Sequence, residues 1–167
     1  MLNIEIKSVL RDRTAMERRL EEVGAEHTVV LRQRDTFYAV RTGWLKLREI
    51  AGEPAELISY ERPTDSAQAR ASAYSRQVLQ DVEGWKTLLG RVLPVEVVVQ
   101  KERTLWMLDH TRIHLDRVED LGDYIELETA AGEIGEEPAR AECERIIELL
   151  ALDRSEFLSL PYRDLLS

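Results

Sequence analysis

The sequence predicts an α+β fold that is mainly β: an eight-stranded antiparallel closed barrel, or tunnel, with a charged interior and helices packed outside. Three observations predict it. Short segments in which apolar and polar residues alternate recur through the whole chain. Most of them are separated only by short turn signals, which favours antiparallel pairing. Only three segments have helical periodicity, and a barrel would hide the edges of so many strands.

The first half of the chain is expected to contain five strands and one helix. The first strand is expected over 2–10, where apolar and polar residues alternate. A helix follows over 14–23, with Thr14 as its N-cap, Glu17 completing a capping box and Gly24 ending it. Four more alternating segments, separated by turn signals, are expected over 28–39, 44–51, 55–62 and 73–80.

The second half begins with a helix over 82–91, which starts after Asp81 and is expected to direct Trp85, Leu88 and Leu89 inward. Three strands joined by short polar turns follow over 95–108, 111–119 and 123–131. The last helix, 137–151, is expected to be amphipathic through Ala141, Ile146, Ile147, Leu149 and Leu150.

The composition is that of an ordinary globular protein with one domain over 1–167, since no linker or repeat interrupts it. A formal net charge of −9 disfavours nucleic acid and anionic membranes, which are bound mainly through excess Lys and Arg. The single cysteine, Cys143, excludes an intramolecular disulfide and is expected in the core. The sequence has no apolar run of membrane-spanning length and no signal peptide, so a cytoplasmic location is expected.

Charged residues occupy alternate positions, and therefore one face, of several predicted strands. Bases lie on the middle strands, at Lys46, Arg48, Lys101 and Arg103, and acids on the first and last, at Glu5, Glu126 and Glu128. Alternate residues on a strand lie roughly 6.6–6.8 Å apart, so neighbouring acids can converge on one cation. The alternative is the solvated face of a half-exposed sheet. Sorting of the charges by strand argues against it, because a solvated face more often mixes signs.

Eight segments carry a family resemblance in order along the chain: NIEIK at 3–7, QRDTFY at 33–38, GWLKLR at 43–48, YERP at 60–63, KER at 101–103, LDRV at 115–118, LGDYIELE at 121–128 and YRDLL at 162–166. Together they resemble the CYTH superfamily of triphosphate tunnel metalloenzymes, and within it the single-domain class IV adenylyl cyclase-like branch. The resemblance implies an eight-stranded tunnel whose acids hold Mg²⁺ or Mn²⁺ and whose bases bind a triphosphate.

The resemblance also implies roles for the residues at matching positions. The expected metal ligands are Glu5, Asp116, Glu126 and Glu128. The expected substrate-binding residues are Lys7, Lys46, Arg48, Arg62, Lys101 and Arg103, with Arg76 and Arg112 added by alternation. The expected catalytic residues are Glu5, Lys7 and Asp116. Oxygen ligands suit hard cations such as Mg²⁺ and Mn²⁺. The expected partner is ATP, tripolyphosphate or thiamine triphosphate, with no nucleic acid and no membrane, and a homodimer is compatible with this reading.

The chain departs from the family pattern at Asn3, where a glutamate is expected, and this puts the number of bound metal ions in question. His114 is expected to be a hydrogen-bonded residue of the barrel interior rather than a metal ligand. Three functions stay open. A cyclase would direct the ribose 3′-oxygen at the α-phosphorus, a triphosphatase would direct water at the γ-phosphorus, and a non-catalytic module would only bind the triphosphate or nucleotide. A lipocalin-like barrel is disfavoured by the charged interior.

Overall fold

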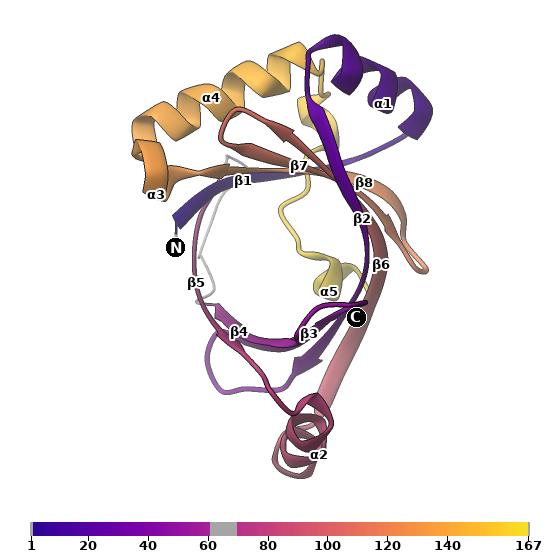
Figure 1. Cartoon of the computed structure of the whole chain (residues 1–167), viewed down its shortest axis with the longest axis vertical. Coiled ribbons are helices and arrows are strands. Elements are labelled where there is room, and N and C mark those ends of the chain that lie inside the picture. The colour runs from indigo at the N-terminus through magenta and orange to yellow at the C-terminus, as the bar shows by residue number, and fades with distance from the viewer. Residues whose placement is uncertain (1, 61–69, 167) are drawn as a thin grey trace.

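The computed structural model describes residues 2–60 and 70–166, and eight antiparallel strands pair around a ring in it (Figure 1). The strands are β1 (Leu2–Val9), β2 (Glu26–Tyr38), β3 (Trp44–Ile50), β4 (Glu56–Tyr60), β5 (Arg70–Val78), β6 (Val95–Leu108), β7 (Thr111–Val118) and β8 (Gly122–Ala130). Their order is β1-β5-β4-β3-β2-β6-β7-β8, with β8 also paired to β1. Within residues 2–60 and 70–166, the β1–β5 ladder joins four residue pairs, so the described part of the tunnel is a strongly curled sheet with a short seam. The predicted fold class is confirmed.

The helices lie mostly outside the ring. They are α1 (Arg13–Glu22), α2 (Val82–Val92), α3 (Ala131–Ile134), α4 (Glu136–Leu149), the 3₁₀ helix η1 (Arg154–Glu156) and α5 (Tyr162–Leu165). Figure 1 shows α1 and α4 over the side formed by β1, β7 and β8, α2 at the opposite end and α5 within the outline of the ring. The three long helices were predicted, whereas the short α3, η1 and α5 were not. Within the described ranges, no helix is long and apolar enough to cross a membrane.

The start of α1 differs from the prediction. Asp12, not Thr14, is the N-cap, and its carboxylate accepts a hydrogen bond of 2.9 Å from the backbone N–H of Ala15. Both residue types cap helices well, and the aspartate two positions earlier adds one residue to the first turn. Gly24 ends the helix as predicted, with a positive φ of 80°.

The inward faces predicted for α2 and α4 are partly wrong. In α2, Leu89 is buried, but Trp85 and Leu88 are 37% and 52% exposed. In α4, Ala141 is exposed and Leu149 is 42% exposed. Each helix packs against the barrel along one narrow side only, so apolar residues that fall outside that side remain in contact with solvent.

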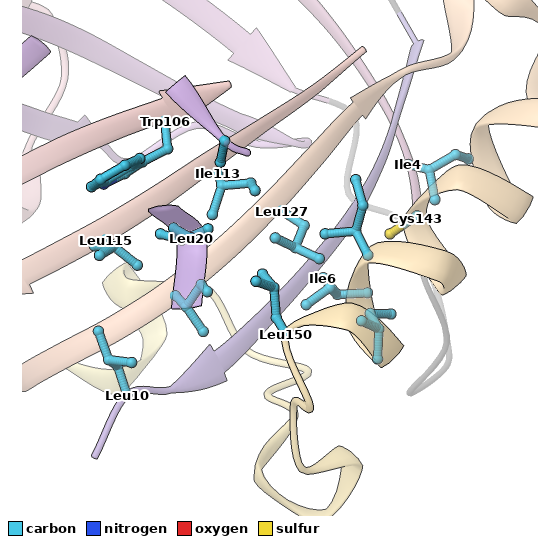
Figure 2. Close-up of a cluster of buried hydrophobic side chains, with 14 of the residues drawn as sticks. Ile4, Ile6, Leu10, Leu20, Trp106, Ile113, Leu115, Leu127, Cys143 and Leu150 are labelled. Carbon is cyan, nitrogen blue, oxygen red and sulfur yellow. The ribbon is translucent and has the colours of Figure 1, made fainter. Parts of the chain in front are cut away.

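The main hydrophobic core lies between the outward face of β1, β7 and β8 and the helices α1 and α4. Figure 2 shows the side chains that meet there, among them Ile4, Ile6, Leu20, Ile113, Leu127, Cys143 and Leu150. The core position predicted for Cys143 is confirmed, and burial raises the pKa of its thiol to about 11. Because the apolar positions of these strands face the helices, the alternating charged positions face the tunnel.

A second cluster closes one end of the tunnel. Phe37, Val118 and Tyr124 are buried there together with Tyr162 of the C-terminal segment. The segment is anchored by the backbone N–H of Leu158, which donates a hydrogen bond of 2.9 Å to the carbonyl of Lys7. It crosses the ring in Figure 1. The tunnel is therefore filled at this end by the chain's own C-terminal residues.

Candidate functional site

The inward faces of the strands and the C-terminal segment enclose a cavity of about 500 Å³, a volume typical of ligand sites. Most of the residues predicted to form the site line it: Glu5, Lys7, Lys46, Arg48, Arg76, Lys101, Arg103, Arg112, Glu126 and Glu128. Asp116 lies below this lining, with an exposed fraction of 0%. Arg62 falls outside the described residues.

Asp35 of β2 organises the first group of bases. Its carboxylate accepts hydrogen bonds from Lys46 Nζ at 2.7 Å, from Arg48 Nε and Nη2 at 2.9 and 3.0 Å, and from Gln33 Nε2 at 3.2 Å. Burial alone would raise the pKa of Asp35, but the two bases outweigh it and lower the pKa. Asp35 was not predicted as a site residue. Its position, alternating with Gln33 and Phe37 on one strand, was the available signal.

Asp116 of β7 organises the second group of bases, Lys101 and Arg103. It accepts hydrogen bonds from Lys101 Nζ at 2.9 Å, from Arg103 Nε and Nη2 at 2.7 Å each, and from the Tyr162 hydroxyl at 2.9 Å. Burial opposes ionisation, yet Arg103 and Lys101 lower the pKa of Asp116 below its ordinary value. Both carboxylate oxygens are engaged in this way, so Asp116 holds the orientation of the two bases.

The two Lys–Arg pairs, Lys46 with Arg48 and Lys101 with Arg103, are prepared for an anion. Burial, followed by the charge of Arg48, lowers the pKa of Lys46 to about 8. Burial and Arg103 likewise lower the pKa of Lys101 to about 8. A lysine in this state gains a full charge when an anion arrives beside it. The arginines remain charged and offer the paired N–H geometry that fits phosphate oxygens.

Acids occupy the wall formed by β1, β7 and β8. The ligand atoms of His114, Glu126 and Glu128 all lie within 4.8 Å of one another. Glu5 pairs directly with Glu128 across the β1–β8 ladder, as Lys7 pairs with Glu126. These four residues, Glu5, His114, Glu126 and Glu128, are called the acid cluster below.

His114 is in the interior, as predicted, with 4% exposure, but within the described part of the chain the hydrogen bond expected of it is absent at Nδ1. Its Nδ1 atom lies 3.7 Å from a carboxylate oxygen of both Glu126 and Glu128, too far for a hydrogen bond, and this buried atom has no hydrogen-bond partner among the described residues. Burial, followed by the charge of Arg103, lowers the pKa of His114, which favours the neutral imidazole. An unpartnered nitrogen between two carboxylates fits a bound cation, which would use it as a ligand.

Unequal pKa shifts within the acid cluster also fit a bound cation. Burial, followed by the charges of Glu128 and Glu126, raises the pKa of Glu5 to about 8. Glu126 also suffers burial, but Lys7, 3.3 Å away, contributes to a pKa well below the ordinary value. The cluster is short of positive charge, and a divalent cation would supply it.

The remaining predicted residues lie at the edge of this arrangement. Arg112 Nε and Nη2 donate to Glu128 at 3.1 and 3.0 Å. Arg76 donates to Glu56 at 3.1 Å and is half exposed. Asn3 is buried, lines the cavity and faces the same way as Glu5. It brings a neutral amide to the position where a carboxylate was expected.

Tyr162 joins the C-terminal segment to the basic side of the cavity. Besides its hydrogen bond to Asp116, its ring lies 3.9 Å from Lys7 Nζ and 4.9 Å from Lys101 Nζ. These distances are those of cation–π contacts. In the sequence, residues 162–166 contributed only to the family resemblance, and their position in the fold was not predicted.

Comparison with known proteins adds the following findings. The model of the CYTH domain family matches residues 1–160. The PH1012 protein of Pyrococcus horikoshii is 23% identical, with a TM-score of 0.87 and 98% of both chains covered. A candidate adenylate cyclase from Vibrio parahaemolyticus is 18% identical, with a TM-score of 0.77 and 99% and 98% covered. A candidate adenylyl cyclase from Hippeastrum, with a dominant triphosphatase activity, is 15% identical, with a TM-score of 0.60 and 89% and 88% covered. No curated protein sequence matches the chain.

Proposed function

The chain belongs to the CYTH domain family, and on that premise we propose that it is a metal-dependent enzyme that binds a triphosphate in its tunnel and cleaves it. The proposed reaction is that of a class IV adenylyl cyclase, which converts ATP to cyclic AMP and pyrophosphate. One observation carries the proposal: two largely buried Lys–Arg pairs and an acid cluster line a single cavity of about 500 Å³. Bases for the phosphates and acids for a cation are what a metal–triphosphate complex requires.

Glu126, Glu128 and His114 would hold the metal, joined by Glu5 once it has lost its proton. When bound, Mg²⁺ or Mn²⁺ supplies charge neutralisation on the phosphates and orients the attacking oxygen. Of the residues predicted as metal ligands, Asp116 is proposed instead to position Arg103 and Lys101, because both of its oxygens accept hydrogen bonds from them.

The Lys–Arg pairs would bind the phosphates. Arg48 and Arg103 bind phosphate oxygens through paired N–H groups, and Lys46 and Lys101 add point charges. Asp35 and Asp116 fix these groups before the substrate arrives. Donors held in advance cost no reorganisation as negative charge moves onto the leaving phosphate, and this stabilises the transition state. Lys7, which lies between Glu126 and the ring of Tyr162, would add a further positive charge for the phosphates.

A triphosphatase is the second candidate. It needs the same metal and bases but directs water at the γ-phosphorus. The Hippeastrum protein, which shares the fold, is described as having a dominant triphosphatase activity, and this favours the candidate.

Phosphorus NMR separates the candidates in one series. The protein is incubated with Mn²⁺ at mildly alkaline pH and with ATP, tripolyphosphate or thiamine triphosphate in turn. Cyclic AMP with pyrophosphate is the expected result, and release of orthophosphate would assign the triphosphatase. Glu126→Gln and Glu128→Gln should abolish either activity. If all three compounds bind and none is turned over, the enzyme proposal is wrong and a binding module remains.

A further inference from the structure

Exposed apolar side chains gather on and around helix α2. Among the described residues, nine large apolar side chains are exposed, and five of them lie on α2 or within four residues of its ends: Val78, Trp85, Leu88, Val92 and Val95. Figure 1 shows α2 outside the ring, at the end away from α1 and α4, so neither of these helices covers it. Exposed apolar side chains gathered in one place mark a contact site, whereas single scattered ones do not.

Three of these residues, Trp85, Leu88 and Val92, are called the α2 stripe. Their spacings of three and four residues place them on one face of the helix. The helix packs on the barrel through a neighbouring side, where Leu89 is buried in a hydrophobic cluster. In the described part of the chain, no residue of the α2 stripe belongs to such a cluster, and Val92 is 65% exposed. The α2 stripe therefore does not contribute to the core, and burying it under a matching surface would be stabilising.

The charges beside the α2 stripe indicate which surface matches it. Asp81, the N-cap of α2, and Arg91, in its last turn, lie at opposite ends of the stripe, and both are exposed. Within the described ranges neither forms an ion pair, and the Asp81 carboxylate accepts a hydrogen bond of 2.9 Å from the backbone N–H of Gly84. Two antiparallel α2 helices bring the Asp81 end of each to the Arg91 end of the other, whereas parallel helices would bring like charges together. The helix dipoles also favour the antiparallel pair. The α2 stripe thus complements a second copy of itself.

We propose that two copies of the chain form a dimer in which their α2 stripes pack against each other, antiparallel about a twofold axis near Leu88. Leu88 then contacts its counterpart, and Trp85 lies alongside Val92 of the other copy, because both are roughly 4.5–6 Å from the axis along the helix. The contact uses the same surface on both copies, so it closes at two. Because α2 lies outside the ring, both tunnels stay accessible, and the dimer does not depend on the triphosphate site.

The size of the α2 stripe sets the strength of the dimer. Three side chains that are partly exposed offer a few hundred Å² of apolar surface on each copy. Two copies together would bury less than about 1,200 Å², which is the range of weak, reversible interfaces. The dimer should therefore dissociate on dilution, with a Kd on the order of 10–100 µM.

Sedimentation equilibrium of the full chain between about 2 and 300 µM, a range that brackets this Kd, tests the proposal. Leu88→Lys places two positive charges at the axis and should raise the Kd at least about tenfold. Leu149→Lys, at a position on α4 that is 42% exposed, is the matched control and should leave the Kd unchanged. Circular dichroism with a thermal melt shows whether both variants are folded.

Cross-linking tests the position of the axis without a change of charge. Leu88→Cys, under mild oxidation, should form a disulfide-linked dimer, because a residue near the axis faces its counterpart. Thr87→Cys, exposed on a different side of α2, is the control and should form far less of it. Cys143 is fully buried and should not take part.

A monomer at every concentration would overturn the proposal. So would a dimer that Leu88→Lys leaves intact, or one that both lysine variants weaken equally, since the contact would then lie elsewhere. Equal cross-linking of Leu88→Cys and Thr87→Cys would show that the helices do not meet along the α2 stripe. A mass that grows beyond two copies would exclude a twofold contact.

Discussion

Replacing Glu5 by glutamine removes a carboxyl group whose pKa is raised to about 8 by burial and by the charges of Glu128 and Glu126. Between the ordinary pKa of 4.5 and about 8, the folded protein keeps a proton on Glu5 that the unfolded chain has released. The native state then binds more protons than the unfolded state, so the metal-free protein loses stability as pH rises through this window. One pKa unit corresponds to about 1.4 kcal/mol. From pH 6 to pH 8, the loss attributable to Glu5 is therefore roughly 2–3 kcal/mol, and Glu5→Gln should lack it.

The same proton must leave before Glu5 can bind a cation, because carboxylate ligands bind metals in the ionised form. The affinity for Mn²⁺ should rise by up to roughly tenfold per pH unit between pH 6 and pH 8, with nearly one proton released per ion at the lower pH. In Glu5→Gln the affinity at pH 8 should be lower, and this part of its pH dependence should disappear.

Urea denaturation in EDTA at pH 6, 7 and 8 measures the first effect, and calorimetry of Mn²⁺ binding in two buffers of different ionisation enthalpy measures the second. Lys46 and Lys101 also titrate near pH 8, but they do so in both proteins, so the difference between the two reports Glu5. Glu22→Gln, an exposed position on α1, is the matched control. Parallel stability curves for the wild type and Glu5→Gln over this range, together with equal proton release, would refute the reasoning.

Four further outcomes are expected. Asp35→Asn leaves two buried cations without their carboxylate and should cost about 3–5 kcal/mol in urea denaturation, with tripolyphosphate restoring part of it; a loss below 1 kcal/mol would contradict this. Arg103→Ala should weaken triphosphate binding, measured by calorimetry, by about 1.5–3 kcal/mol, while Mn²⁺ binding without nucleotide persists. An equal loss of both affinities would refute a phosphate-binding role for Arg103. His114→Gln should reduce Mn²⁺ affinity more than Mg²⁺ affinity, because nitrogen ligation favours the softer ion, and an equal change would exclude the nitrogen as a ligand. Asn3→Glu should raise turnover or lower the Mn²⁺ concentration needed for it, whereas an unchanged metal dependence would mean that position 3 does not contribute to the metal site.

Local periodicity accounts for the part of the site that could be predicted from the sequence. A strand has a side-chain period of two, so Lys46 and Arg48, or Glu126 and Glu128, must share a face wherever their strands lie. The structure places all four in the cavity. The register between strands is not local, and for this reason Asp35 was missed: its link to Arg48 comes from a ladder partner that periodicity does not identify.

The C-terminal segment could not be placed for a different reason. Residues 157–166 have no sustained period, and their position depends on contacts with distant strands. Tyr162 reaches Asp116, 46 residues away, and Arg163 lies near the rings of Phe37 and Trp44. Trp85 was predicted to be buried because its helical spacing resembles that of a buried side chain. It is exposed because the barrel offers it no facing surface, and the sequence does not show where that surface lies.

The division of charges between two walls has a consequence for how ligands bind. On the basic wall, Asp35 and Asp116 already neutralise part of the positive charge of the Lys–Arg pairs, so a triphosphate meets less net positive charge there than four bases alone would offer. On the acidic wall, the proton on Glu5 competes with a cation. The basic wall alone therefore binds a triphosphate weakly, and the acidic wall alone binds a cation weakly. A metal ion that neutralises phosphate charge strengthens binding at both walls. Coupling of this kind is reciprocal, so the triphosphate must raise the affinity for the metal by the factor with which the metal raises the affinity for the triphosphate. Calorimetric titrations in both orders should return the same factor, and a triphosphate affinity that does not change with Mn²⁺ would show that the two walls act independently.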